Sequence, residues 1–323
     1  MQVVLVTGGS GFIGGNFIDF TMGNTLNRVI NLDKLTYASR EIKADPHRYT
    51  FVHGGIENSE LVRHILQTHK PSIIVNFAAE THVDRSIQFP DPFVDTNIVG
   101  TYNFLKELLR YRETCEFTFV HISTDEVYGE LMHMDSAPFT EESPFLPNSP
   151  YSATKAASEH LVRAFQKTYD LPAIITNSTN NYGPYQFPEK LIPKTIYNAY
   201  RNIPIPVYGT GTNRRDWLYV DDHCRAIWAI INRGRVGERY NIAGNCERTT
   251  LDIVQTILSQ MDKPDSLIYM AADRPGHDFR YALDTTKIAT EVEWWPETSF
   301  GIGIEYTIQW YLNNMDWVRS WIK

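Results

Sequence analysis

The chain has 323 residues, of which 42% are hydrophobic and 21% charged, a composition typical of soluble globular proteins with one or two domains. A net charge of −8 without a basic stripe argues against a protein that binds nucleic acid. No apolar run is long enough to span a membrane, and the three widely spaced cysteines suggest neither a metal site nor a disulfide framework, so we expect a cytoplasmic protein.

The first half of the chain alternates short apolar runs with helical stretches. We predict strands over 3–7, 28–33, 49–53, 73–79, 117–123 and 173–177. The helices expected between them begin near Phe12 and then cover 61–68, 92–112 and 152–169. This alternation is typical of a parallel sheet with helices on both faces, which predicts a Rossmann-type, doubly wound α/β fold.

The pattern becomes less regular after about residue 180. Proline and glycine separate shorter elements, and aromatic residues become dense near the end of the chain. We therefore predict a sheet domain over 1–179 and a smaller, mixed α/β substrate domain over 180–323. A helix expected at 221–232 suggests that about 215–242 return to the first domain.

A glycine-rich run over 7–14 follows the first strand and opens the first helix. Its glycines recur at every third position: Gly8, Gly11 and Gly14. Without side chains there, backbone N–H groups can approach a pyrophosphate, and the helix dipole favours the negative charge. A plain strand-to-helix turn is the alternative, but the second strand ends in Asp33, whose carboxylate can bind ribose hydroxyls and disfavours the extra phosphate of NADP. We expect 1–179 to be an NAD-binding domain.

Tyr151 and Lys155 are four residues apart, and so lie on one face of a predicted helix. A free tyrosine has a pKa of about 10, and a nearby ammonium group favours its phenolate. Tyr151 could then take a proton from a sugar hydroxyl while a hydride leaves the same carbon. The same pair on an exposed helix would be inert, so the argument depends on its position after a dinucleotide-type fold opening.

Two adjacent carboxyl groups, Asp125 and Glu126, follow the strand predicted at 117–123. Ligands of open parallel sheets bind at the carboxyl ends of the strands. In a shared pocket of low dielectric constant, repulsion would keep one carboxyl protonated as an acid and the other ionised as a base. The alternative is structural: Asp125 would cap the following turn, and Glu126 would be solvated.

Taken together, these motifs resemble those of the extended short-chain dehydrogenase/reductases (the NAD-dependent epimerase/dehydratase family), and within them the dTDP-glucose 4,6-dehydratases. The Thr124-Asp125-Glu126 triplet is the most specific, because the related 4-epimerases keep the tyrosine and lysine but differ there. The resemblance covers nearly the whole chain, through the runs 7–14, 33–38, 78–87, 123–129, 150–156, 180–191, 215–218 and 273–278.

This resemblance implies a hydro-lyase of deoxysugar biosynthesis that converts dTDP-glucose to dTDP-4-keto-6-deoxyglucose and water. Tyr151 would deprotonate the 4-hydroxyl while NAD takes a hydride from C4. Glu126 would then remove the C5 proton, Asp125 would protonate the leaving 6-hydroxyl, and the hydride would return to C6. The same chemistry on UDP-glucose or another nucleotide hexose, or a 4-epimerase, is the alternative.

The resemblance also assigns residues by motif position. The catalytic group would be Thr124, Asp125, Glu126, Tyr151 and Lys155. Cofactor contacts would be made by Gly8, Gly11, Phe12, Ile13, Gly14, Asp33, Lys34, Thr36, Ile56, Ala78, Ala79, Thr96, Tyr151, Lys155 and Asn181. Nucleotide-sugar contacts would be made by Thr81, Thr124, Asn180, Lys190, Leu191, Pro206, Val207, Tyr208, Arg215, Thr250, Arg274 and His277.

Two further expectations come from the same resemblance. The helices predicted at 92–112 and 152–169 would pair across a two-fold axis as the four-helix interface of a homodimer; alternatively, they only cover the sheet. Gly55 stands where the family usually has an aspartate near the adenine, and Glu57 could compensate for it.

Overall fold

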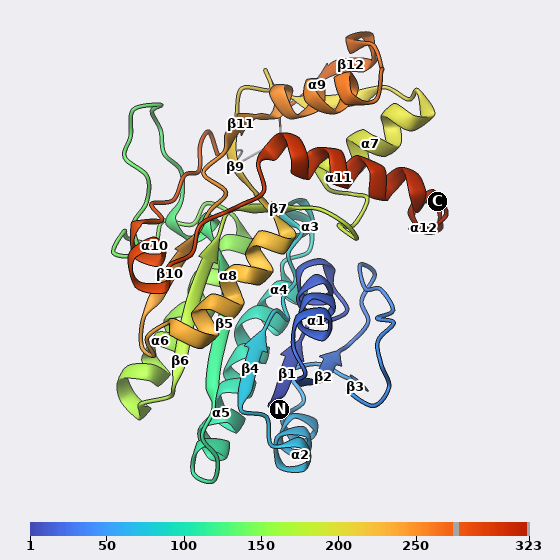
Figure 1. The fold of residues 1–323 in the computed structure, drawn as a ribbon. Helices are drawn as coiled ribbons and strands as arrows, with labels where there is room; N and C mark the ends of the chain where they lie inside the picture. The colour runs from blue at the N-terminus through green and yellow to red at the C-terminus, as the bar shows by residue number, and fades with distance from the viewer. Residues whose placement is uncertain (274–277, 322–323) are drawn as a thin grey trace.

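The computed structural model describes residues 1–273 and 278–321, and a parallel sheet forms its centre (Figure 1). Its seven strands lie in the order β10-β6-β5-β4-β1-β2-β3. They are β1 (Val3–Thr7), β2 (Arg28–Asp33), β3 (Tyr49–His53), β4 (Ile73–Asn76), β5 (Thr118–Thr124), β6 (Ala173–Ser178) and β10 (Arg239–Ile242). All adjacent pairs are parallel, which confirms the predicted Rossmann-type fold.

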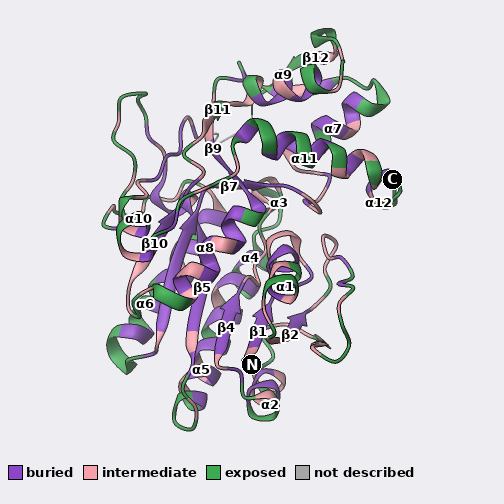
Figure 2. Cartoon of the chain, viewed as in Figure 1, coloured by how far each residue is buried: buried purple, intermediate pink, exposed green. Residues whose placement is uncertain are grey.

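Alternate side chains along the strands support a helical layer on each face of the sheet. Val4 and Val6 pack with α1 (Phe12–Asn24) and α8 (Val220–Arg233), whereas Leu5 belongs to the core on the opposite face. That opposite face is covered by α2 (Ser59–His69), α5 (Thr101–Arg112) and α6 (Pro150–Tyr169). The strands are largely buried, while exposed residues lie mainly on outward helix faces and loops (Figure 2).

The expected strand over 73–79 is shorter in the structure, where β4 ends at Asn76. The chain then leaves the sheet and passes directly over the glycine-rich loop. A Cβ atom on Gly8 would lie 2.6 Å from the backbone nitrogen of Ala78. Residues 77–79 therefore form a wall above the sheet edge instead of continuing the strand.

The helix expected at 92–112 is present but is not a uniform α-helix. It consists of α4 (Asp91–Phe93), a π-helix (Val94–Gly100) and α5. Within the π-helix, the amide of Asn97 bonds both backbone polar groups of Glu80 and donates to the Thr154 hydroxyl at 2.9 Å. π-Helical turns are rare and often lie at functional sites, and this one fastens the segment after β4 to α6.

The rest of the chain forms a smaller, mixed α/β region above the carboxyl edge of the sheet (Figure 1). Its strands are β7 (Asn180–Tyr182), β9 (Arg214–Tyr219) and β11 (Glu247–Thr249) in one sheet, and β8 (Ile205–Tyr208) and β12 (Ile268–Ala271) in another. Its helices include α7 (Leu191–Arg201), α9 (Thr250–Gln260), α11 (Phe300–Asn313) and α12 (Met315–Trp321). The remaining helices are α3 (Val83–Gln88) and α10 (Thr286–Val292).

Side chains from α7, α9, α11 and β9 form the apolar core of this smaller region. By contrast, α8 packs on the main sheet and β10 is one of its strands, whereas β9, at the start of the segment expected to return there, belongs to the smaller sheet. The domain boundary at residue 179 stays a prediction.

No helix in 1–273 or 278–321 combines the length and hydrophobicity needed to cross a membrane. The same residues contain no cluster of three His, Cys, Asp or Glu side chains that could hold a metal ion.

Candidate active site

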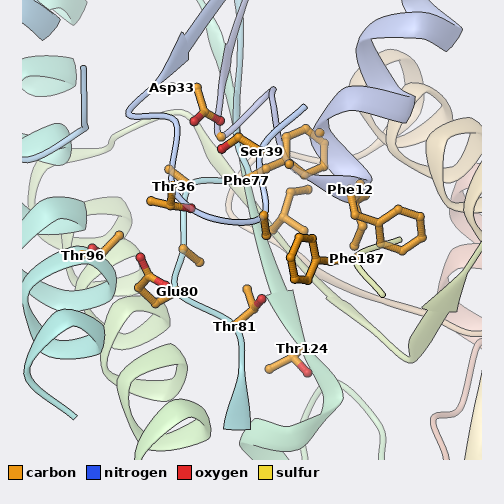
Figure 3. Close-up of a pocket in the computed structure, with 18 of the residues that line it drawn as sticks. Phe12, Asp33, Thr36, Ser39, Phe77, Glu80, Thr81, Thr96, Thr124 and Phe187 are labelled. Carbon is orange, nitrogen blue, oxygen red and sulfur yellow. The ribbon is translucent and has the colours of Figure 1, made fainter. Parts of the chain in front are cut away.

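Two adjoining cavities lie at the carboxyl edge of the main sheet. The first, of about 310 Å³, lies where the strand order changes direction between β1 and β4, the usual ligand position in open α/β sheets (Figure 3). The second, of about 480 Å³, extends toward α7 and β8. Residues that line both are Thr81, Glu126, Asn180, Asn181, Gln186, Glu189 and Lys190.

All residues predicted to bind the cofactor line the first cavity. Gly8 adopts a φ of 70°, a conformation that favours glycine, and lies directly against Ala78. Asp33 ends β2 at the cavity wall, where its carboxylate accepts from the backbone nitrogens of Ser10 at 2.9 Å and Leu35 at 2.7 Å. These hydrogen bonds fix the carboxylate in the position expected to face a ribose.

Gly14 provides a direct test of the close backbone packing in this loop. A methyl group on Gly14 would lie 2.4 Å from the carbonyl oxygen of Gly8, so we expect Gly14→Ala to displace the loop. Overpacking of this kind costs about 1–3 kcal/mol, and NAD affinity should fall as well. Denaturant unfolding and NAD titration measure both effects. Gly23→Ala in the same helix is the control because no atom lies within 4 Å of the added methyl, and equal NAD affinity of the two variants would contradict the expectation.

Tyr151 and Lys155 reach the first cavity from α6. A capping box between Ser149 and Ser152 fixes the start of this helix. Burial, and then the nearby Glu126 carboxylate, raise the pKa of Tyr151 above its ordinary value. Lys155 donates to the carbonyl oxygen of Ile122 at 2.8 Å, and burial lowers its pKa. Both side chains are thus held at the end of β5 and largely shielded from water.

The two adjacent carboxyl groups differ in burial and in their access to the cavities. Glu126 lines both cavities, whereas Asp125 lines neither and is only 2% exposed. Thr124 caps the short 3₁₀ helix over Asp125–Tyr128 by accepting from the backbone nitrogen of Glu126 at 3.3 Å, and it donates to Asp125 Oδ1 at 3.2 Å. Asp125 is therefore not the capping residue, and Glu126 is not simply a surface carboxylate.

Asp125 has the environment of a protonated acid. Its Oδ2 atom is buried and has no hydrogen-bond partner within the described part of the chain. Burial, followed by repulsion from Glu126, raises the pKa of Asp125 well above its usual value. The pair thus combines a buried carboxyl of raised pKa with an accessible one, the asymmetry needed by an acid and a base.

Most residues predicted to bind the nucleotide sugar line the second cavity: Thr81, Asn180, Lys190, Leu191, Pro206, Tyr208, Arg215 and Thr250. Thr124 instead lines the first cavity. The side chain of Val207 reaches neither cavity, because alternation along β8 points it into the core against α9. Arg274 and His277 lie outside the described residues.

Several cavity residues were given no role from the sequence, although Tyr37, Phe187 and Glu189 stand in runs that carry the family resemblance. Tyr281 lines the second cavity, its ring lies 4.3 Å from the Arg215 guanidinium, and its hydroxyl donates to Asp278. Tyr37, Phe187 and Glu189 also line the first cavity. These residues belong to loops, where neither periodicity nor motif spacing indicates which side chains face a ligand.

The structure also shows what surrounds Gly55, which stands where the family usually has an aspartate. Glu57 lines the first cavity, and its carboxylate lies where a side chain on residue 55 would point. A Cβ atom on Gly55 would be 2.2 Å from Glu57 Oε2. An acidic group is therefore present at this wall, supplied two residues further along the chain.

Comparisons with known proteins agree with this geometry. The GDP-mannose 4,6-dehydratase family matches residues 5–307. A dTDP-glucose 4,6-dehydratase from Xanthomonas campestris pv. campestris (strain B100) is 49% identical, over 99% of this chain and 96% of its own length. One from Escherichia coli is 48% identical, over 97% of this chain and 94% of its own length.

Among solved structures, the dTDP-glucose 4,6-dehydratase of Streptomyces venezuelae, crystallised with NAD, has a TM-score of 0.94 and 42% identity, with 99% of this chain and 100% of that chain covered. The UDP-glucose 4-epimerase of Thermotoga maritima has a TM-score of 0.89 at 27% identity, with 97% and 100% covered. The fold is thus shared with epimerases, whereas sequence identity is higher to the dehydratases.

Proposed function

Because the chain belongs to the nucleotide-sugar 4,6-dehydratase family, among the dTDP-glucose 4,6-dehydratases, we propose that it converts dTDP-glucose to dTDP-4-keto-6-deoxyglucose and water with NAD. The observation that carries the proposal is the arrangement of Asp125 and Glu126 beside Tyr151. Glu126 lines both cavities, Tyr151 lines the first, and Asp125, whose pKa is raised by burial, lies buried next to Glu126. An elimination between two oxidation–reduction steps needs this combination of groups.

The first cavity fits NAD. Gly8, Gly11 and Gly14 line the cavity, so a pyrophosphate could approach the loop backbone there, and the Asp33 carboxylate is held for a ribose. When bound, NAD supplies a hydride acceptor, a hydride donor for the return step and a positive charge near Tyr151. Lys34 completes this end of the site by donating to Thr96 at 2.8 Å and pairing with Glu80 at 3.5 Å.

The protein's own groups then move the protons. Tyr151 would act as its phenolate, which the positive charges of Lys155 and of bound NAD would have to favour against the effect of burial, and would accept the proton of the sugar 4-hydroxyl. Thr124 bonds the sugar 4-oxygen. Glu126 removes the C5 proton, which the neighbouring C4 ketone makes acidic. Asp125 donates its proton to the 6-hydroxyl, so that it leaves as water.

The second cavity would hold the nucleotide diphosphate. The guanidinium group of Arg215 lines the second cavity and donates to the backbone oxygens of Asp278 (2.9 Å) and Phe279 (3.3 Å). A guanidinium fork suits diphosphate oxygens. Lys190, at the junction of the two cavities, adds a second positive charge.

Parallel turnover of dTDP-glucose, UDP-glucose and N-acetylated UDP-glucose tests the proposal and the choice of nucleotide. The protein is first supplied with NAD, and product is followed by the alkaline absorbance of the 4-keto-6-deoxy sugar. We expect the highest kcat/KM with dTDP-glucose. Absence of product from all three would contradict a dehydratase, and preference for a uridine nucleotide would change the substrate but not the chemistry.

We further propose that the enzyme is a cytoplasmic homodimer formed through α5 and α6. Val94, Val99 and Tyr102 are each more than 40% exposed along the outer side of the π-helix and the start of α5. Such a row of large apolar side chains favours a protein partner over water. The three free cysteines fit a reducing compartment.

Replacing Tyr102 with glutamate should convert the dimer to a monomer, because association through this face would bury an unpaired carboxylate from each subunit. Sedimentation velocity at micromolar concentration measures the change. Tyr269→Glu is the control, since Tyr269 is similarly exposed on β12, away from these helices. A monomeric wild-type protein would remove the dimer proposal.

A further inference from the structure

A polar cluster lies between the two cavities, and the chemistry above uses none of its members. Tyr37 comes from the loop after β2, His82 and Arg85 from the start of α3, and Glu189 from segment 183–190 before α7. Tyr37 and Glu189 line the first cavity, and His82 and Glu189 line the second. Three segments that are distant in sequence therefore meet at the wall shared by both sites.

Three groups converge on the carboxylate of Glu189. The Tyr37 hydroxyl donates to Oε1 at 2.9 Å, His82 Nε2 lies 3.3 Å from Oε2, and Arg85 lies 3.8 Å from the same oxygen. The Glu189 side chain is only 19% exposed, so these contacts are partly shielded from water. Arg85 therefore compensates the charge of Glu189, and Tyr37 and His82 add neutral polar contacts.

The protonation of His82 suits this arrangement. Its Nδ1 atom accepts from the backbone nitrogen of Arg85 at 3.3 Å, at the N-terminus of α3. Burial lowers the pKa of His82, so the ring is neutral at pH 7 and its proton lies on Nε2. That atom can donate to Glu189, and the contact does not require a charged histidine.

Aromatic contacts reinforce the same junction. The Arg85 guanidinium lies 3.6 Å from the centre of the Tyr37 ring. Phe187, which projects into the first cavity in Figure 3, meets Tyr37 edge-on with ring centres 5.2 Å apart. On its other side, Phe187 contacts Trp321 of α12 at 5.4 Å. Segment 183–190 is thus held between the loop after β2 and the end of the described chain.

We propose that Glu189 is a positioning residue that ties segment 183–190 to the loop after β2 and thereby retains NAD in the first cavity between turnovers. The inference rests on the proposed function, in which the hydride removed from C4 must return to C6 of the same molecule. Tyr37 and Glu189 both line the cavity and are bonded to each other, so their bond closes one side of it. Cofactor release on that side requires this bond to open.

The test measures how fast the holoenzyme releases its cofactor, without any substrate. NADH fluorescence is followed in a stopped-flow instrument after mixing with excess NAD. Tyr37→Phe removes only the hydrogen bond to Glu189, and we expect release about fivefold faster. Glu189→Ala removes every contact to the carboxylate, and we expect release about tenfold faster. Glu60→Gln is the control, because Glu60 is exposed on α2 and lines neither cavity.

The double variant distinguishes a tie from general loosening of the fold. If the two residues act through one bond, Tyr37→Phe combined with Glu189→Ala releases NADH no faster than Glu189→Ala alone. Wild-type release rates in both single variants, or effects that multiply in the double variant, would overturn the inference. Wild-type protein that binds no NADH at all would instead defeat the proposed function, so the two failures are distinguishable.

Discussion

Replacing Tyr151 with phenylalanine should reduce kcat for dTDP-glucose by about 10²–10⁴-fold, the usual contribution of a positioned general base. Phenylalanine keeps the aromatic ring and its edge contact with Phe93, whose ring centre is 6.4 Å away, so α6 should remain in place. Only the hydroxyl that accepts the C4 hydroxyl proton is lost. Steady-state turnover measures the change, and NAD titration should give a dissociation constant close to that of the wild type.

Tyr200→Phe is the matched control for this variant. Tyr200 is 39% exposed on α7 and lines neither cavity, so its hydroxyl has no access to the substrate. Its turnover should equal that of the wild type. Equal turnover of Tyr151→Phe and Tyr200→Phe would show that another group is the base.

Replacing Glu126 with glutamine should abolish product formation to a similar degree, because an amide cannot accept the C5 proton. The variant should also lose exchange of the C5 hydrogen with solvent deuterium, which NMR of the sugar detects directly. Glu126 is the accessible carboxylate that lines both cavities, whereas Asp125 is buried behind it. We therefore assign proton removal to Glu126.

Asp125→Asn should behave differently in the same experiment. The C5 hydrogen should still exchange, while loss of water slows strongly because no acid protonates the 6-hydroxyl. Since burial, followed by repulsion from Glu126, raises the pKa of Asp125, its acid form persists to higher pH than that of an ordinary carboxyl and is lost as the pH rises further, so kcat of the wild type should fall on the alkaline side. Full turnover by an Asp125→Asn, Glu126→Gln double variant would favour a 4-epimerase.

Six of the seven strands of the main sheet were predictable from sequence because each is a short apolar run bounded by helical stretches, whereas β10 was not predicted as a strand. The expected ends were within two residues for most strands, and β4 was the exception. Residues 77–79 are apolar or small like the strand before them, but in the structure they pass close to Gly8 and no longer belong to the strand. Nothing local in the sequence records that tertiary contact.

The candidate site was predictable where motif spacing reflects secondary structure. Tyr151 and Lys155 share a helix face, and the glycine loop follows a strand, so their places follow from periodicity. How deeply each carboxyl group is buried was not predictable. Asp125 and Glu126 are adjacent in sequence but differ in their access to the cavities, because a 3₁₀ turn begins between the strand and the loop. The tie through Glu189 joins loops distant in sequence, and residue types alone do not reveal such a pairing.

The π-helix at Val94–Gly100 fixes how many residues the chain needs between the first cavity and the core beneath the sheet. In an α-helix each residue rotates the chain by about 100° about the helix axis. The wider turn of the π-helix therefore sets the direction of Thr96, which lines the first cavity, relative to Phe104, which lies in the core beneath the sheet. Deleting one residue between them would rotate either Thr96 away from the cavity wall or Phe104 out of the core. Point substitutions should thus be tolerated along this stretch far better than single-residue deletions.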